Sequence, residues 1–294
     1  MRARCIASLG LGSLAARGAL VYGSPADGGG AAKSAPPPTA RQPPGLLKKC
    51  AAEAVGTGLI VLLGCGSVCS VKYLASGMTL GGVSVIWGSA VALAVFATRE
   101  ISGAHLNPAI TAALAFHRPQ EVPLSLALPY AAAQTAGAAC AAALNFAVFK
   151  RAIAALEARE GVLRGKPGSY TSAAGAFGML PNAAVVRTPG ALGAEVLATG
   201  VLSYLVFALT DKDNGVPSNA APALIGAAVT TLVSVFGPVT GAGMNPARDV
   251  GPRLVTAAVG WGSASLKAAH VYTLGPIAGA IAGAGLYDAL KAIG

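Results

Sequence analysis

Six long apolar runs constrain this chain more than any other feature of its sequence. The 294 residues are 54% hydrophobic and only 11% charged, whereas about a quarter of the residues of a soluble domain are charged. Each run is about long enough to cross the hydrocarbon core of a bilayer. We therefore expect an all-α membrane protein with six transmembrane helices, near residues 51–71, 80–99, 122–149, 190–210, 220–237 and 270–290.

Two further apolar stretches are too short, or too polar at their starts, to cross a bilayer. They run from Asn107 to Phe116 and from Asn245 to Val259, and they are predicted to be re-entrant half-helices. The segment from about 150 to 189 carries several basic residues together with glycine and proline. We expect this segment to be an extramembrane loop.

Residues 1–45 differ from the rest of the chain. They contain runs of glycine and proline and no acidic residue before Asp27. This composition is typical of a disordered tail, although Arg2, Arg4 and Arg17 also fit an organelle-targeting segment. The membrane domain is predicted to span residues 46–294.

The membrane part of the chain repeats itself. The segment 52–58 is similar to 194–200, and the segment 103–109 is similar to 241–247. Each copy holds three predicted crossings, and because three is odd, the second copy enters the membrane from the opposite side. The result is an inverted repeat whose two half-helices meet near the midplane. The copies are predicted to span about 50–149 and about 190–292.

The tripeptide Asn-Pro-Ala opens both predicted half-helices. Asn is favourable at a helix N-terminus and Pro at the first helical position, so one copy alone would indicate an ordinary helix start. Two helix starts inside lipid leave backbone amides unpaired, which is costly unless they line a polar cavity. The pair therefore predicts a water-filled path lined by Asn107, Pro108, Ala109, Asn245, Pro246 and Ala247.

Such a path favours neutral solutes that carry an oxygen acceptor. Each half-helix directs its partial positive end at the midplane, and the two Asn amides can donate to a passing oxygen. A cation or a relayed proton would meet opposing dipoles from both sides. Arg248 follows the second motif, and an intramembrane arginine is a candidate for binding hydroxyl or water oxygens and for repelling cations. Conduction of this kind needs no cofactor.

These motifs resemble those of the major intrinsic protein, or aquaporin, family across residues 50–292. The resemblance implies six tilted helices and two half-helices around one pore per subunit, in a homotetramer. It also implies that Glu53 and Glu195 hold the pore-lining loops extended. The alternative is a place at the membrane interface, which Lys49, four residues before Glu53, makes plausible for one of them. The loop carbonyls implied to line the pore belong to Gly103, Ala104, His105, Gly241, Ala242 and Gly243.

The selectivity filter of the family maps onto Trp87, Val233, Ala242 and Arg248. Trp87 is similar to the aromatic residue against which glycerol channels pack the carbon backbone of a polyol. Water-selective members usually have His at the position of Val233, and glycerol channels commonly have Gly there and Phe at the position of Ala242. The chain departs from both patterns, so we expect an apolar, fairly wide filter. Four further positions resemble the glycerol branch: Asp249, Arg253, Pro276 and Ile277.

We therefore predict a passive channel for glycerol, water and other small uncharged solutes, such as urea or small polyols, in the plasma membrane or an organelle membrane. A water-selective aquaporin remains an alternative, as do a coupled secondary transporter, which needs an ion site, and a structural protein of membrane junctions. His105 could instead be a pH-sensitive gate. Asp249 and Arg253, four positions apart, could be a surface ion pair.

Other classes of function are not indicated. No catalytic arrangement accompanies the three histidines, so we do not expect an enzyme. No metal site is predicted, because Cys65 and Cys69 have no His or acidic partner nearby in the sequence. The basic residues are scattered, which does not indicate a nucleic-acid partner.

Overall fold

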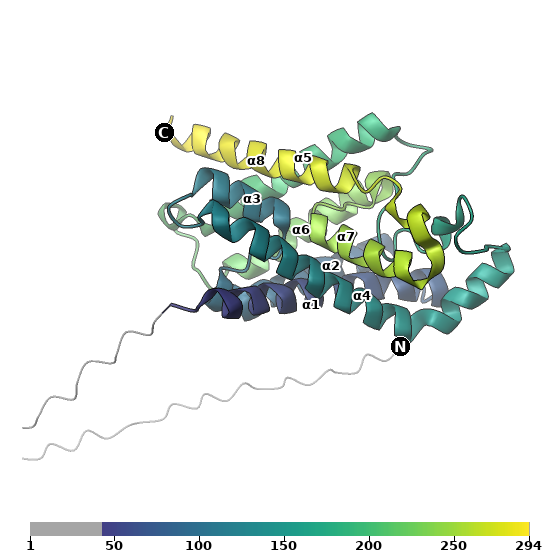
Figure 1. Cartoon of the computed structure of the whole chain (residues 1–294). Helices are drawn as coiled ribbons and strands as arrows, with labels where there is room; N and C mark the ends of the chain where they lie inside the picture. Colours follow the sequence, from purple (N-terminus) through teal and green to yellow (C-terminus); the bar gives the residue numbers. More distant parts are fainter. Residues whose placement is uncertain (1–42, 294) are drawn as a thin grey trace, which may run out of the picture. The chain divides into compact units, whose positions relative to one another are not determined.

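The computed structural model describes residues 43–293, and within them the regular elements are helices, with no strand (Figure 1). The predicted tail therefore lies almost wholly outside the described residues. The short helices are α3 (Pro108–His117) and α7 (Pro246–Thr256). The long helices are α1 (Leu46–Leu74), α2 (Leu80–Ser102), α4 (Leu124–Glu160), α5 (Thr188–Thr210), α6 (Ala221–Thr240) and α8 (Val271–Lys291).

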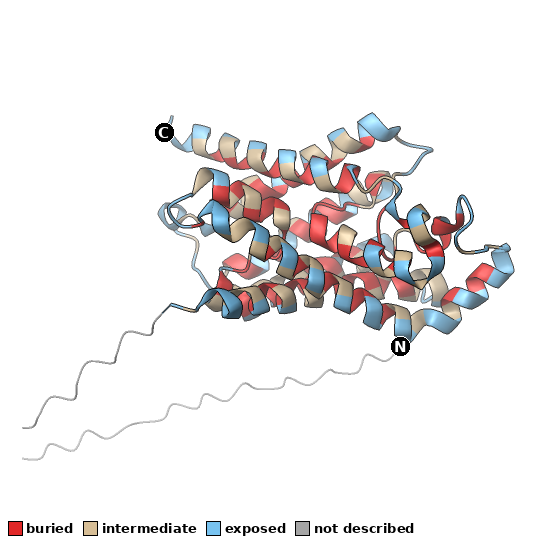
Figure 2. Cartoon of the chain, in the orientation of Figure 1, coloured by how far each residue is buried: buried red, intermediate tan, exposed pale blue. Residues whose placement is uncertain are grey.

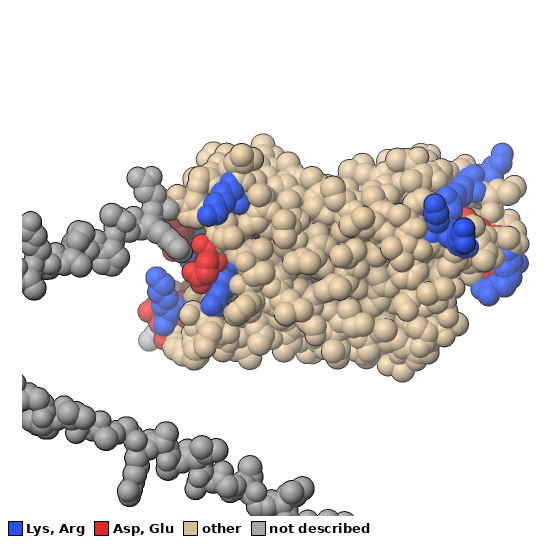
Figure 3. Space-filling view, turned by 90° about the horizontal axis from the view of Figure 1, so that it is seen from below, with Lys and Arg blue, Asp and Glu red and all other residues tan. Residues whose placement is uncertain are grey.

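Five of the long helices, α1, α2, α4, α5 and α6, are long and apolar enough to cross a membrane. Many of their large apolar side chains point outward, as Leu93, Leu128 and Leu197 do, and extensive exposed apolar surface marks a membrane or protein contact. On the face shown in Figure 3, charged side chains gather at the two ends and leave an uncharged band between them. The prediction of a multi-pass membrane protein is confirmed.

The sixth predicted crossing, α8, differs from the other five in composition. It is 21 residues long, but it carries four glycines and ends with Asp288 and Lys291. It nevertheless packs along the length of α5, which is itself one of the apolar spans. Length and packing, rather than composition, therefore place α8 among the crossings.

Close glycine contacts pair the helices in the same way in both repeats. A Cβ added at Gly137 of α4 would overlap the backbone of Ala54 in α1, and a Cβ added at Gly283 of α8 would overlap the backbone of Gly200 in α5. Thus the first and third long helices of each repeat lie in direct backbone contact. The second long helices, α2 and α6, pack against each other.

The two half-helices complete the bundle. Helix α3 packs against α8, and α7 packs against α4, so each half-helix lies against the last long helix of the other repeat. Figure 1 shows α3 and α7 inside the bundle, and Figure 2 shows that they carry many buried residues, whereas the outer sides of α4 and α8 are exposed. The predicted inverted-repeat arrangement is the one observed.

The segment predicted as a loop from 150 to 189 is partly helical. Helix α4 runs on to Glu160, a total of 37 residues, which at 1.5 Å per residue is about 55 Å and exceeds a bilayer core of about 30 Å. The stretch 150–160 is rich in Ala, Arg, Leu and Glu, which are strong helix formers. The helix ends at Gly161, whose left-handed backbone (φ 64°) suits glycine. The remaining loop contains the one-turn helix η1 (Ser169–Ser172).

Candidate functional site

The side chains of Asn107 and Asn245 tie the two half-helices together, N-terminus to N-terminus. The side-chain amide of Asn107 donates to the carbonyl of Met244 at 2.8 Å, and that of Asn245 donates to the carbonyl of Leu106 at 2.8 Å. Their side-chain oxygens accept from the amides of Ala109 at 2.9 Å and Ala247 at 3.0 Å. Since an Asn amide has two N–H groups, each Asn keeps one donor for another partner.

The loops that precede the half-helices have the same unusual backbone in both repeats. Gly103 and Gly241 each have φ 87°, Ala104 and Ala242 each have φ 51°, and Leu106 and Met244 have φ 51° and 49°. Non-glycine residues rarely adopt such left-handed angles. The loops therefore depend on side chains that hold their N–H groups.

Two fully buried glutamates hold these N–H groups. Glu53 of α1 accepts from the amide of His105 at 2.9 Å and from that of Leu106 at 2.6 Å. Glu195 of α5 accepts from the amide of Gly243 at 2.9 Å and from that of Met244 at 2.8 Å. Each glutamate thus binds the loop that precedes one half-helix, and neither is exposed.

The same contacts direct carbonyl groups to the opposite side of each loop, because the N–H and C=O of one peptide point in opposite directions. Because the amides of residues 105 and 106 point toward Glu53, the carbonyls of Ala104 and His105 point away from it. Holding the amides of residues 243 and 244 does the same for Ala242 and Gly243. The amides of Ala104 and Ala242 donate to the hydroxyls of Ser102 and Thr240. The carbonyls of Gly103 and Gly241 therefore point away from these hydroxyls as well.

Several supporting residues were not predicted from the sequence. Ser102 and Thr240 also donate to the two glutamates at 2.6 Å each. Tyr130 donates to the carbonyl of Ser102 at 2.8 Å, and Tyr272 donates to that of Thr240 at 2.6 Å. The two tyrosines could have been found from the internal repeat, because Tyr130 and Tyr272 are separated by the same number of positions as Glu53 and Glu195.

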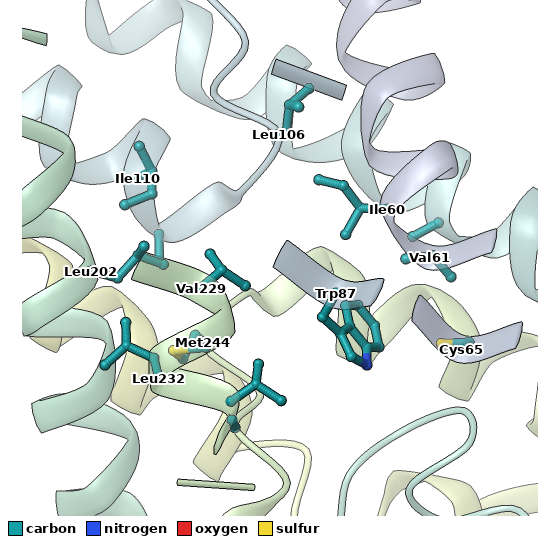
Figure 4. Close-up of a cluster of buried hydrophobic side chains, with 14 of the residues drawn as sticks. Ile60, Val61, Cys65, Trp87, Leu106, Ile110, Leu202, Val229, Leu232 and Met244 are labelled. Atoms are coloured by element: carbon teal, nitrogen blue, oxygen red, sulfur yellow. The ribbon is translucent and has the colours of Figure 1, made fainter. Parts of the chain in front are cut away.

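A cavity of about 90 Å³ runs past both Asn residues. This volume has room for several water molecules. One wall carries polar groups of the two loops and Arg248. The other is apolar and contains Ile60, Leu202 and Val229, which Figure 4 shows among the buried apolar side chains. All four predicted filter residues line this cavity: Trp87, Val233, Ala242 and Arg248.

Of the predicted carbonyl residues, four line the cavity: Ala104, His105, Ala242 and Gly243. Gly103 lines a wider vestibule of about 520 Å³ that adjoins it. Gly241 is not among the residues that line either space, and a Cβ at this position would overlap the side chain of Met179. A role for the Gly241 carbonyl in the pore wall stays a prediction.

Arg248 is held rigidly although it is an intramembrane charge. Its side chain is 4% exposed, its guanidinium carbon lies 4.3 Å from the centroid of the Trp87 ring, and it donates to the carbonyl of Phe177 at 3.2 Å. Phe177 comes from the loop between α4 and α5, so this loop folds back into the site. This contact could not be predicted from the sequence, because every residue has a main-chain carbonyl.

Asp249 and Arg253 are completely buried, so they are not a surface ion pair. Asp249 accepts from the Arg253 side chain at 2.5 Å and from the amide of Met179 at 2.7 Å. Arg253 also donates to the carbonyls of Ser265 at 2.6 Å and Lys267 at 2.8 Å. The pair thus fastens two loops to α7 directly behind Arg248, and it does not line the cavity.

Pro276 and Ile277 lie on α8 and do not line the cavity. Pro276 stands at the repeat position of Gln134, whose side chain donates to Glu53 at 2.7 Å. Proline has no side-chain donor, so Glu195 lacks this contact. Ile277 packs against the buried apolar cluster.

The vestibule is the charged end of the path. Its wall includes Lys49, Arg99, Glu100, Asp211 and Lys212. Hydrogen bonds from Lys291 and from Tyr287 hold the pKa of the Asp211 carboxyl well below its usual range. Both signs of charge are present, so the vestibule does not select a particular ionic solute.

The remaining candidates have structural surroundings. His105 Nδ1 lies 3.2 Å from the Thr111 hydroxyl, and its ring packs edge-on against Tyr130. Cys65 and Cys69 are free thiols buried in α1. Among the described residues, no group of three or more His, Cys, Asp or Glu is placed to hold a metal ion.

Membrane-spanning helices around a path with one polar and one apolar wall define a membrane channel. The profile of the Major intrinsic protein family matches residues 41–287. The chain belongs to this family, whose members are channels rather than enzymes.

Curated relatives cover most of the chain. A glycerol uptake facilitator protein of Haemophilus influenzae is 39% identical over 259 residues, which cover 85% of this chain and 95% of the relative. The glycerol uptake facilitator protein of Escherichia coli is 38% identical, covering 82% and 87%. A propanediol uptake facilitator of Salmonella typhimurium is 38% identical, covering 82% and 93%.

The fold is also that of a solved structure. The X-ray structure of the aquaglyceroporin from Plasmodium falciparum superposes with a TM-score of 0.73, at 21% identity, covering 84% of this chain and 97% of that one. This similarity confirms the predicted aquaporin-like fold.

Proposed function

We propose that the chain is a passive channel for glycerol, other small polyols and water. The observation that carries this proposal is the two-sided cavity: loop groups, two Asn amides and Arg248 on one wall, and aliphatic side chains on the other. A polyol has hydroxyls along one side of a carbon chain, so it can bind both walls at once. Glycerol and propanediol are also the solutes named for the relatives.

Passive conduction is favoured over coupled transport by the distribution of charge. The basic side chains in the cavity wall are those of Arg248 and His105, and the wall includes no carboxylate. The carboxylates of Glu53 and Glu195 lie behind the loops, where backbone amides occupy them. A transporter would need an ion site exposed to the path, and these groups do not supply one.

Preference for glycerol over water alone rests on the filter. Val233 and Ala242 leave it without the His that usually narrows a water-selective pore, and Trp87 offers an apolar ring for a carbon backbone. Arg248 then serves the hydroxyls. Glu53, Glu195, Asp249, Arg253, Pro276 and Ile277 support the filter and its loops in this proposal.

Domain organisation and assembly follow the family resemblance. Residues 46–294 form the channel domain, with the repeats at about 50–149 and 190–292 and the extramembrane segment at about 150–189. The assembly is a homotetramer with one pore in each subunit. Chemical cross-linking in the membrane tests the tetramer, because four cross-linked chains are then the largest abundant species.

The channel function is tested by stopped-flow light scattering of proteoliposomes. An inward gradient of glycerol should give rapid shrinkage by water loss, followed by reswelling as glycerol enters. Empty liposomes provide the control. Water flux without reswelling would favour the water-selective alternative.

A further inference from the structure

The cavity and the vestibule meet at a short stretch of shared wall. The filter residue Trp87 lines only the cavity, as do Val233, Ala242 and Arg248. The path from the filter therefore passes the two Asn residues and then reaches the shared wall. Six residues line both spaces: Val95, Ala104, His105, Ile110, Val206 and Ile225.

Four of these residues are the repeat counterparts of the four predicted filter residues. Each pair is separated by the same number of positions as Asn107 and Asn245. In this way Ile225 corresponds to Trp87, Val95 to Val233, Ala104 to Ala242, and Ile110 to Arg248.

The contact between α2 and α6 shows that this correspondence is spatial. Gly88 of α2 and Gly226 of α6 have the same separation in sequence. A Cβ added to either glycine would overlap the backbone of the other. The two helices are therefore related by the symmetry of the inverted repeat at the level of the pore wall.

We propose that Val95, Ala104, Ile110 and Ile225, called here the apolar ring, form a second constriction that selects permeants by the number of hydroxyl groups they must desolvate. This inference rests on the proposed function, since it assumes that polyols pass through the path. The filter and the apolar ring then stand at the two ends of one cavity, related by the inverted repeat.

The chemistry of the apolar ring is opposite to that of the filter. Where the filter has the donors of Arg248, the apolar ring has the aliphatic side chain of Ile110, and none of its four side chains can form a hydrogen bond. Among the six residues that line both spaces, His105 carries the only polar side chain. A permeant can therefore bind through one side only.

Each hydroxyl that loses its water and finds no partner at the apolar ring adds to the barrier. Propane-1,2-diol has two hydroxyls and a methyl group, glycerol has three hydroxyls, and erythritol has four. The apolar ring therefore ranks these solutes in the order propanediol, glycerol, erythritol, even where the filter has bound their hydroxyls equally well.

The test is Val95→Thr, because threonine has nearly the shape of valine and adds one hydroxyl. Its matched control is Val85→Thr, the same change at an outward-facing residue of the same helix, which lines neither space. Permeabilities of propane-1,2-diol, glycerol and erythritol are measured in proteoliposomes with equal amounts of assembled protein. We expect Val95→Thr to raise the erythritol-to-propanediol ratio by about fivefold, as one added hydrogen bond allows, and Val85→Thr to change it by less than about twofold.

An unchanged ratio in Val95→Thr, or an equal rise in Val85→Thr, overturns the proposal. If Val95→Thr does not assemble, the pair Ile225→Thr and Ile225→Val gives the same comparison, because both shorten the side chain and only one adds a hydroxyl. A wild-type protein that conducts no polyol refutes the proposed function itself. Glycerol conduction with unaltered ratios in all variants refutes the apolar ring alone.

Discussion

The guanidinium carbon of Arg248 lies 4.3 Å from the centroid of the Trp87 ring, so the charge of the filter is stacked on its aromatic side chain. Such cation–π contacts are strongest when they are desolvated, and Arg248 is almost fully buried. The carbonyl of Phe177 binds the same guanidinium. The width of the filter should therefore be set by the two remaining side chains, Val233 and Ala242.

Narrowing these two positions should separate glycerol from water. In the double variant Val233→His, Ala242→Phe, both new rings enter the cavity, so a polyol no longer fits between Trp87 and Arg248 while water still does. We expect glycerol permeability to fall roughly tenfold or more, a penalty of about 1.4 kcal/mol, with most water permeability retained. Stopped-flow measurements on proteoliposomes check both rates.

The control for this variant is Val235→Phe, which enlarges an outward-facing residue of the same helix. It should leave both permeabilities unchanged. Unaltered glycerol flux in a well-assembled double variant would show that Val233 and Ala242 do not form the narrowest point.

Removing the carboxylate of Asp249 should make the filter less rigid, although Asp249 does not itself line the cavity. Asp249→Ser leaves the fully buried Arg253 without its ion-pair partner, and breaking a buried pair from one side costs about 3–5 kcal/mol. It also frees the amide of Met179, two residues after Phe177. Glycerol flux should fall more than water flux, and the thermal midpoint of the purified protein should drop.

Asp213→Ser is the matched control, because Asp213 is an exposed acid whose ion pair with Lys291 lies at the surface. Exposed pairs contribute about 0–1 kcal/mol, so this variant should resemble the wild type. Equal losses of glycerol and water flux in Asp249→Ser would count against a filter-shaping role.

Changes to the loop-holding glutamates should affect all permeants together. Glu195→Gln places an amide N–H₂ where one of two backbone N–H groups needs an acceptor, and a lost hydrogen bond to a charged group costs about 1.5–3 kcal/mol. We expect water and glycerol permeability to fall by a similar factor. Glu160→Gln, at an exposed ion pair outside the bundle, serves as the control, and a selective loss of one permeant would contradict the loop-holding role.

His105 should act as a structural residue rather than as a pH gate. Its ring is fixed between the Thr111 hydroxyl and Tyr130. We therefore expect glycerol permeability to vary by less than about twofold between about pH 5.5 and 7.5, the range in which an ordinary imidazole titrates. A steep pH dependence that disappears in His105→Asn would establish gating instead.

Much of the fold was predictable because the sequence contains an internal repeat, so each helix of one half has a counterpart in the other. The paired Asn-Pro-Ala motifs located α3 and α7, and the apolar runs located the long helices. The end of α4 was not predicted, because the charges after Lys150 indicated a loop although the same residues favour a helix. Helix α8 is not among the helices whose mean hydropathy indicates a span, so its length was the better guide.

The candidate site was predictable only where it is formed by side chains rather than by main-chain groups. Trp87 and Arg248 could be placed from motifs and family resemblance. Phe177 could not, because its contribution is a main-chain carbonyl in a loop whose path depends on Met179 and Arg253 contacts far away in sequence. Tyr130 and Tyr272 could have been found by aligning the two repeats.

The most direct test of the central claim, passive conduction of polyols, is glycerol uptake into proteoliposomes with and without an imposed proton or sodium gradient. Radiolabelled glycerol inside the vesicles is measured until it reaches a plateau, and membrane current is recorded in parallel in planar bilayers. We expect the internal concentration to stop at the external one under every gradient, with no current above that of protein-free bilayers. Accumulation of glycerol above its external concentration when a gradient is imposed would contradict the account.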